Sequence, residues 1–263
     1  PKYGVISQFP VMVSSSNETI LENYSSARSF EHFEVGYSIF GLKRYNITVE
    51  LTASHRVGLH RYTFPIAKDN AKVILNLSHI LSFGWGGAII SLSNNQIKGV
   101  GQYKGGWNSD GLYKVYFCSQ FNVNATDQAP WWNNRINENM TSYVGTTGNK
   151  IGAILTFDTI KNPIIISRVG ISFISSDQAC DNAESEIPDW DFDIVRQKNV
   201  DAWNNELGKI KVESDDEYLK TIFYSGLYRT MIIPSDRTGE NPKWKTVDKN
   251  GKPVPYYEDF YTL

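Results

Sequence analysis

The spacing of apolar residues changes once along this chain, and the change divides it into a β part and a helical part. Up to about residue 175, short runs rich in β-branched and aromatic residues alternate with turns of Gly, Asn, Asp and Pro, as in KVILNLS, VYFCSQF and IGAILTF. No helical pattern lies between these runs, so they indicate a large antiparallel β-sandwich rather than βαβ units. We therefore expect a mainly β fold, with one β-sandwich domain over residues 1–175.

After residue 176 the apolar residues follow a helical period, and linker helices are expected over residues 176–212. A further helix is expected to begin at a capping box formed by Ser214 and Glu217, in which each side chain bonds the backbone N–H of the other residue. Its buried stripe has the spacing i, i+3, i+4 and i+7 and consists of Leu219, Ile222, Phe223 and Gly226. Residues 213–263 are therefore predicted to be the start of a helical domain.

The last residues, YYEDFYTL, form a dense aromatic run without a helix cap or a polar tail. A helical domain cannot bury its apolar face with two helices alone. We therefore expect the chain to be a fragment of a longer protein.

Charge and composition exclude several classes of partner. The chain of 263 residues is 41% apolar and 13% aromatic, which is enough for a sizeable core. Its 26 basic and 28 acidic residues give a formal charge of −2 and no broad positive field for nucleic acid. No apolar run reaches the roughly 18 residues of a membrane span. We expect a neutral partner, and neither nucleic acid nor a membrane.

Acceptor motifs for N-glycosylation favour a secreted, extracellular glycoprotein. Six Asn-x-Ser/Thr motifs occur, all before residue 140, at Asn17, Asn23, Asn46, Asn76, Asn124 and Asn139. In YNITVEL the apolar residues alternate with polar ones, which predicts that Asn46 lies on the solvent face of a strand. The two cysteines, Cys118 and Cys180, fit a single disulfide in such a compartment; two buried free thiols are the alternative.

Several stretches resemble glycoside hydrolase family 92, and they cover nearly the whole chain in the order of the family. They are PKYGVISQFPV, GQYKGGWNSDGLYKVYFCSQF, RVGISFISSDQACDNAESEIP, GLYRTMIIPSDRTGENPKW and YYEDFYTL. This is a family of calcium-dependent exo-acting α-mannosidases, and the chain closely resembles its secreted fungal members. The resemblance implies a β-sandwich, truncated at its N-terminus, then linker helices and the first helix of an incomplete (α/α)6 barrel.

The resemblance also implies a function for the longer protein. It implies hydrolysis of terminal α-linked mannose from glycans such as N-glycans, with the α-1,2 linkage preferred. The reaction inverts the configuration at the anomeric carbon, and one carboxyl group acts as the acid and a second as the base. In the family these groups and the calcium ligands lie mostly in the later barrel. No residue of this chain inherits a catalytic or metal-binding role, and we expect the fragment to be inactive without its remaining barrel. The alternative is a non-catalytic carbohydrate-binding or structural β-sandwich module.

The polar loop after Pro234 supplies the candidate substrate-binding residues. Carboxylates and planar polar groups suit the recognition of sugar hydroxyls. The loop carries Ser235, Asp236, Arg237, Glu240 and Asn241, and Asp259 in the terminal run is a similar candidate. The alternative is a surface loop held by its own Asp and Asn side chains.

Other residues give weaker signals. Trp107 is a candidate stacking platform for a sugar, although the glycines around it favour a hairpin turn. Trp131 and Trp132 are adjacent, so in a strand only one of them is expected to be buried. His55 and His60 lack nearby Cys or carboxylate residues in the sequence, which favours structural roles over metal binding.

Overall fold

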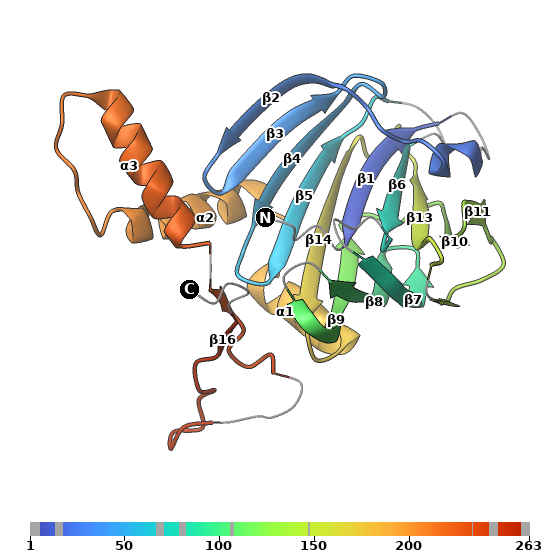
Figure 1. Cartoon of the computed structure of the whole chain (residues 1–263). Coiled ribbons are helices and arrows are strands. Elements are labelled where there is room, and N and C mark those ends of the chain that lie inside the picture. The colour runs from blue at the N-terminus through green and yellow to red at the C-terminus, as the bar shows by residue number, and fades with distance from the viewer. Residues whose placement is uncertain are drawn as a thin grey trace.

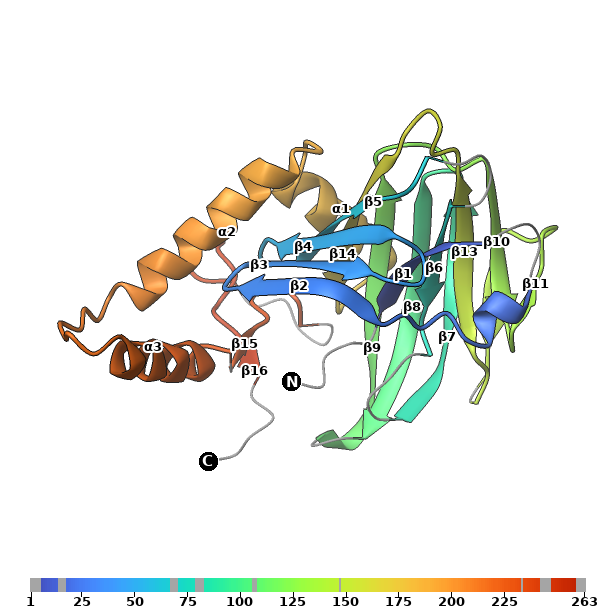
Figure 2. The same ribbon diagram turned by 90° about the horizontal axis from the view of Figure 1, so that it is seen from above.

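A computed structural model describes residues 6–13, 18–66, 71–78, 83–105, 108–146, 148–232, 234–241 and 247–258. Within these ranges two antiparallel β-sheets pack face to face, and three α-helices and a short β-hairpin follow them in the chain (Figure 1). Figure 2 shows the helices gathered on one side of the sandwich. The predicted mainly β fold, a sandwich followed by the start of a helical region, is confirmed.

The smaller sheet has five strands in the order β1-β6-β13-β10-β11. Their bounds are β1 (Ser7–Met12), β6 (Ala71–Asn76), β13 (Ile151–Phe157), β10 (Asp127–Trp132) and β11 (Arg135–Ile136). The larger sheet has nine strands in the order β12-β7-β8-β9-β14-β5-β4-β3-β2. Their bounds are β12 (Tyr143–Gly145), β7 (Phe83–Ser93), β8 (Gln96–Gly105), β9 (Asn108–Phe121), β14 (Ile164–Ser172), β5 (Val57–Thr63), β4 (Ile47–Ala53), β3 (Tyr37–Leu42) and β2 (Arg28–Glu34). A 3-10 helix, η1 (Glu18–Leu21), lies between β1 and β2 in the chain.

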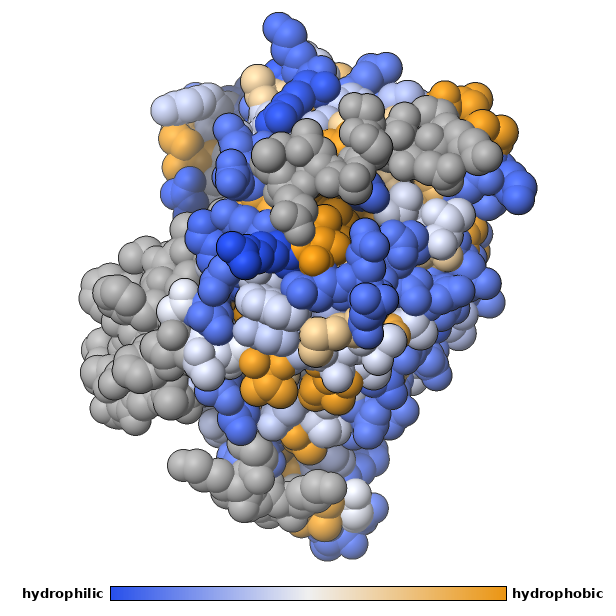
Figure 3. All heavy atoms as spheres, turned by 90° about the vertical axis from the view of Figure 1, so that its right-hand side faces the viewer, coloured by the Kyte–Doolittle hydropathy of each residue, from blue (hydrophilic) through white to orange (hydrophobic). Residues whose placement is uncertain are grey.

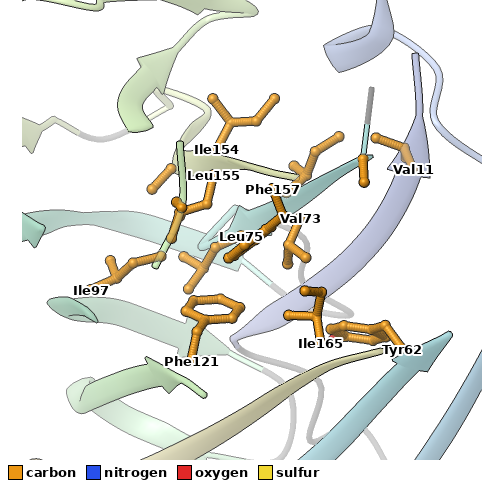
Figure 4. Close-up of a cluster of buried hydrophobic side chains, with 14 of the residues drawn as sticks. Val11, Tyr62, Val73, Leu75, Ile97, Phe121, Ile154, Leu155, Phe157 and Ile165 are labelled. Carbon is orange, nitrogen blue, oxygen red and sulfur yellow. The ribbon is translucent and has the colours of Figure 1, made fainter. Parts of the chain in front are cut away.

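The main core lies between the two sheets. Val73, Leu75 and Phe157 of the smaller sheet meet Phe121 and Ile165 of the larger sheet there (Figure 4). All five are at most 1% exposed. Burial of an aliphatic or aromatic side chain of this size contributes about 1.5–3 kcal/mol. These five side chains are buried because one face of each sheet packs on the other.

The outer face of the larger sheet is covered by helix α1 (Ser176–Glu186) near β14 and β9. Gly170 of β14 permits this close approach, because a Cβ atom there would lie 2.0 Å from the carbonyl oxygen of Ala179. Arg168, on the same face, is 8% exposed; it donates to Gln120 Oε1 at 2.7 Å and to the carbonyl of Ile187. Polar residues of β14 therefore face a helix rather than solvent.

Helix α2 (Phe192–Leu207) covers β4 and β5 on the same outer face. Glu50 of β4 is 9% exposed there, and both its oxygens accept bonds of 2.7 Å from Arg61. Tyr37 also donates to Glu50, at 2.7 Å, and burial raises the pKa of Tyr37 to about 12. Burial alone would raise the pKa of Glu50, but the bonds from Arg61 and Tyr37 hold it below its usual value. The buried negative charge of Glu50 is thus paired with the positive charge of Arg61.

Helix α3 (Glu217–Thr230) begins differently from the prediction. Its N-cap is Asp216, whose Oδ1 accepts from the backbone N–H groups of Tyr218 and Leu219 at 2.9 and 3.1 Å. Ser214 Oγ instead accepts from the backbone of Asp216 at 3.1 Å, so the capping box with Glu217 was wrong. Asp216 is a better cap than Ser214 here, because its carboxylate accepts two backbone N–H groups at the positive end of the helix dipole.

The apolar stripe of α3 is not buried in the part of the chain that the structure describes. Leu219 and Ile222 are 56% and 51% exposed, and no described residue of α3 is buried. The rings of Trp203 in α2 and Tyr228 in α3 lie 4.8 Å apart between their centroids. The prediction of a buried stripe was therefore wrong for this stretch of chain, since α2 touches α3 at few positions.

Cys118 of β9 and Cys180 of α1 form a disulfide, with their Cα atoms 5.0 Å apart. Both are at most 6% exposed and pack with Ala179. The bond fixes α1 to the middle of the larger sheet.

Asn46 lies in the turn before β4 rather than on a strand, and it has a left-handed backbone with φ of 51°. Asparagine tolerates this conformation better than most residues. Trp131 is 1% exposed, while Trp132 stacks on Tyr143 with 4.0 Å between ring centroids. Asn17, Trp107 and Asp259 lie outside the described residues.

His60 of β5 belongs to a polar chain inside the sandwich. Its Nδ1 lies 2.7 Å from Tyr62 Oη, Tyr62 donates to Gln8 at 3.1 Å, and Gln8 donates to Ser119 at 2.5 Å. Since the single hydroxyl proton of Tyr62 goes to Gln8, the Nδ1 of His60 is the donor in its own bond. Burial lowers the pKa of His60 to about 4.

We expect this histidine to make the fold less stable in mild acid. The unfolded chain protonates His60 near pH 6.5 and the folded chain only near pH 4, so the unfolded state binds more protons in this window. The free energy of unfolding should fall by about 2–3 kcal/mol between these pH values. Urea titrations across the window should show a shallower fall for His60→Gln, and an unchanged fall for His32→Gln on the exposed strand β2. Equal slopes in all three proteins would contradict this role.

Candidate functional site

The polar loop after Pro234 lies on a hairpin of β15 (Ser235–Asp236) and β16 (Tyr257–Glu258), below the sandwich in Figure 1. The backbone N–H of Arg237 donates to the carbonyl of Tyr256 at 2.8 Å, and that of Glu240 donates to Arg237 at 2.9 Å. These bonds turn the loop back toward the end of the nine-stranded sheet. The contacts there are made by the turn between β4 and β5, the end of β14, and α1.

Glu240 is the anchor of the loop and is 4% exposed. Its Oε2 accepts from the hydroxyl of Ser172 at 2.6 Å and from the backbone N–H of Phe173 at 2.8 Å. Its Oε1 accepts from Asn182 Nδ2 at 3.0 Å and lies 3.5 Å from Arg56 Nε. Both oxygens are thus engaged inside the protein. The loop sequence had led us to expect Glu240 on the exposed rim of a sugar-binding cleft, but the structure buries it.

Arg56 joins three elements at this point. Its Nη2 donates to the carbonyl of Thr238 at 2.6 Å, and its backbone N–H donates to Glu186 Oε2 at 2.8 Å. Ser54 donates to the same oxygen of Glu186 at 2.6 Å. The turn between β4 and β5 is thereby tied to α1 on one side and to the polar loop on the other.

Asp236 is the exposed carboxylate of the loop. Its Oδ1 accepts from the backbone N–H of Thr238 at 2.9 Å, and its Oδ2 lies 3.6 Å from His55 Nε2. Partial burial would raise the pKa of Asp236, but the bonds from Thr238 and the nearby His55 and Arg56 hold it below its usual value. At neutral pH this side chain is an ionised acceptor beside an imidazole, a pairing that suits sugar hydroxyls.

Arg237 packs its guanidinium over the ring of Phe173, with 3.9 Å from Cζ to the ring centroid. A cation over an aromatic ring is stabilised by the charge distribution of that ring. The structure thus places Asp236 beside His55, Arg237 over Phe173 and Glu240 against Ser172, while Asp259 lies outside the described residues.

Sequence reasoning missed four residues that position this site, namely Arg56, Ser172, Asn182 and Glu186. The only local signal is the polar pair His55 and Arg56 in a turn between two alternating strands. The sequence favours a structural role for His55, and in the structure its ring lies beside Asp236 of the polar loop.

The acidic side chains of the described residues do not gather into a calcium site. Within them, no group of three or more His, Cys, Asp or Glu side chains stands together as metal ligands. Calcium takes six to eight oxygen ligands, and the oxygens of Glu240 already face hydrogen-bond donors and Arg56. No step of a reaction can be assigned to calcium from these residues.

Two family models match the chain. Residues 1–172 match the glycosyl hydrolase family 92 N-terminal domain, and residues 178–262 match the glycosyl hydrolase family 92 catalytic domain. The bond from Ser172 to Glu240 therefore joins the end of the first matched segment to the second.

Relatives agree with this match. The chain is 35% identical, over 244 residues, to an uncharacterized secreted glycosidase of Arthroderma benhamiae; the aligned part is 85% of this chain and 31% of the relative. The fold is similar to the family GH92 α-mannosidase BT3965 from Bacteroides thetaiotaomicron, with a TM-score of 0.80 and 23% identity over 98% of this chain and 36% of that one. It is also similar to the inverting mannosidase BT2199 from the same organism, with a TM-score of 0.74 and 24% identity over 97% of this chain and 33% of that one. The chain thus spans about a third of the length of these relatives.

Proposed function

The chain belongs to glycosyl hydrolase family 92, and we propose that it is the N-terminal part of a secreted α-mannosidase. The longer enzyme removes terminal α-linked mannose from glycans, with the α-1,2 linkage preferred. Its catalytic acid and base are contributed by segments outside residues 1–263, so the chain itself supports and shapes the site.

The observation that carries this proposal is the anchoring of the polar loop by Glu240. The anchor connects the segment that matches the family's N-terminal domain to the segment that matches its catalytic domain. It holds the ionised Asp236 and the stacked Arg237 at the boundary between them. A sugar bound between two domains would meet these hydroxyl-binding groups, as binding sites commonly lie at domain interfaces.

Inversion is supported by the fold relative BT2199, which is named as an inverting mannosidase. Inverting enzymes keep their two carboxyl groups roughly 6.5–9.5 Å apart, so that a water molecule fits between the base and the sugar. The neighbour BT3965 has also been solved in complex with mannoimidazole, and that binding supports mannose as the sugar.

A non-catalytic carbohydrate-binding sandwich is the alternative. The match of residues 178–262 to a catalytic domain favours the enzyme, because a binding module alone would need no such segment.

Secretion of the protein is supported by the curated relative, which is described as a secreted glycosidase. Among the described residues, none of the helices has the length and apolar character needed to cross a bilayer.

We expect calcium removal to abolish the activity of the full-length protein but to leave the β-sandwich folded. We propose that the calcium ligands are contributed by segments outside residues 1–263, so the sandwich should not depend on the ion. The measurement compares release of mannose from α-1,2-mannobiose before and after treatment with a chelator, alongside the urea midpoint. Added calcium should restore the rate, while magnesium serves as the matched control. Full activity in the chelator would contradict the calcium proposal, and sugar binding without any hydrolysis would favour the alternative.

A further inference from the structure

The acceptor motifs for N-glycosylation are not equivalent in the folded chain. Five of the six lie within the described residues, and Asn17 lies outside them. Four of the five have an exposed asparagine, namely Asn23, Asn46, Asn124 and Asn139. Among described residues, none of these four donates a hydrogen bond from its side-chain nitrogen to another residue. The atom that receives a glycan is therefore open in each of them.

Asn76 is different in both position and bonding. It ends β6, which lies between β1 and β13 in the five-stranded sheet, and it pairs with Ser7 and Gly152. Its Nδ2 donates to Tyr24 Oη at 2.7 Å, and its Oδ1 accepts from Ser78 at 2.8 Å. A sugar on this nitrogen would have to share its space with the Tyr24 hydroxyl.

Three of the four open acceptors gather at one end of the larger sheet. The register pairs Thr48 with Thr63, Thr63 with Ile164, and Ser167 with Phe121, so the turn of Asn46 and the loop of Asn124 lie at the same end. Arg44, in the same turn as Asn46, donates to the carbonyl of Asn23 at 2.8 Å and brings that motif to this end as well.

The fourth open acceptor, Asn139, follows β11 at the side of the sandwich. Figure 3 views that side, and its visible residues are mainly hydrophilic with scattered apolar ones. Ser172 and Arg56, which hold Glu240, lie at the opposite end of the larger sheet, where β14 ends and β4 turns into β5. No motif within the described residues lies on the loop or on the helices.

We propose that Asn23, Asn46, Asn124 and Asn139 carry N-glycans and that Asn76 stays unmodified. The donor is an oligosaccharide joined to a lipid pyrophosphate. Transfer breaks the bond between the sugar C1 and the phosphate oxygen and forms a bond from C1 to Nδ2; the lipid pyrophosphate leaves and the amide loses one proton to base. Copies that receive a sugar at Asn76 lose the packing of Tyr24 and fail to fold. The glycans then leave the Glu240 end of the molecule bare.

This proposal rests on secretion of the chain and not on hydrolysis of mannose. The test uses the full-length protein secreted from a eukaryotic host, treated with peptide N-glycosidase in H₂¹⁸O so that each glycosylated Asn becomes ¹⁸O-labelled Asp. Tryptic cleavage separates the motifs into residues 45–56, 73–98, 115–135 and 136–150, while Asn23 is located by fragmentation of residues 3–28. Protein digested without the glycosidase controls for spontaneous deamidation.

We expect label on most copies at the four open sites and on fewer than about one copy in ten at Asn76. As matched variants, Asn139→Gln should lower the intact mass by one glycan, and Asn76→Gln should leave the glycan mass unchanged. Label at Asn76 equal to that at Asn46, or no label at any one of the four sites in secreted protein, would overturn the proposal. A mannosidase assay on the same preparation is independent of either outcome, so the two proposals fail separately.

Discussion

Replacement of Glu240 by alanine should lower the free energy of unfolding of the full-length protein by about 3 kcal/mol. The variant removes a carboxylate that accepts from Ser172, Phe173 and Asn182 and lies beside Arg56. Hydrogen bonds to a charged group contribute about 1.5–3 kcal/mol, and the hydroxyl of Ser172 and the backbone N–H of Phe173 would lose the acceptor that they have in the fold. Urea titration measures the change, and faster tryptic cleavage after Arg237 should accompany it because the loop is released.

Glu206→Ala is the matched control for this variant. Glu206 is a helical carboxylate whose side chain is 46% exposed, and it pairs with Lys209 on the surface. Exposed pairs of this kind contribute at most about 1 kcal/mol. If Glu240→Ala is no more destabilising than Glu206→Ala, then Glu240 does not anchor the loop.

Removal of the disulfide should have an effect of similar or larger size. The double variant Cys118→Ala, Cys180→Ala opens a covalent loop of sequence separation 62. The chain-entropy relation for a loop of this length gives a loss of roughly 4 kcal/mol from the free energy of unfolding. Differential scanning calorimetry should therefore show a clearly lower Tm.

Reduction of the wild-type protein provides the control for this prediction. Excess dithiothreitol should bring the wild-type Tm down to that of the double variant and should leave the variant unchanged. A double variant as stable as the oxidised wild type would show that the packing of α1 on the larger sheet holds without the covalent bond.

The architecture could be predicted from the sequence because it depends on local periods. Strand runs such as those of β6 and β13 are short, apolar and bounded by turn residues, and the helical spacing after residue 176 is equally plain. The start of α3 could not be predicted to the residue. Ser214 and Asp216 are both good caps, and only the structure shows which of them accepts the helix N–H groups.

The site could be predicted only in part, because its anchor depends on contacts between distant residues. Glu240 is 68 positions from Ser172 and 58 from Asn182, and no local pattern reports such a separation. The composition of the polar loop therefore did not predict that Glu240 is buried. Glu50 shows the same limit, since its burial depends on Arg61 of the next strand and on α2, which packs on that face.

The central claim is that this chain is part of an inverting α-mannosidase, and the anomer first released by the full-length protein tests it most directly. Proton NMR during hydrolysis of α-1,2-mannobiose distinguishes the anomers before mutarotation mixes them. We predict that β-mannose is formed first, because water attacks the face opposite to the departing sugar. Initial release of α-mannose would contradict inversion, and no hydrolysis of any α-mannoside by the full-length protein in calcium would contradict the enzyme itself.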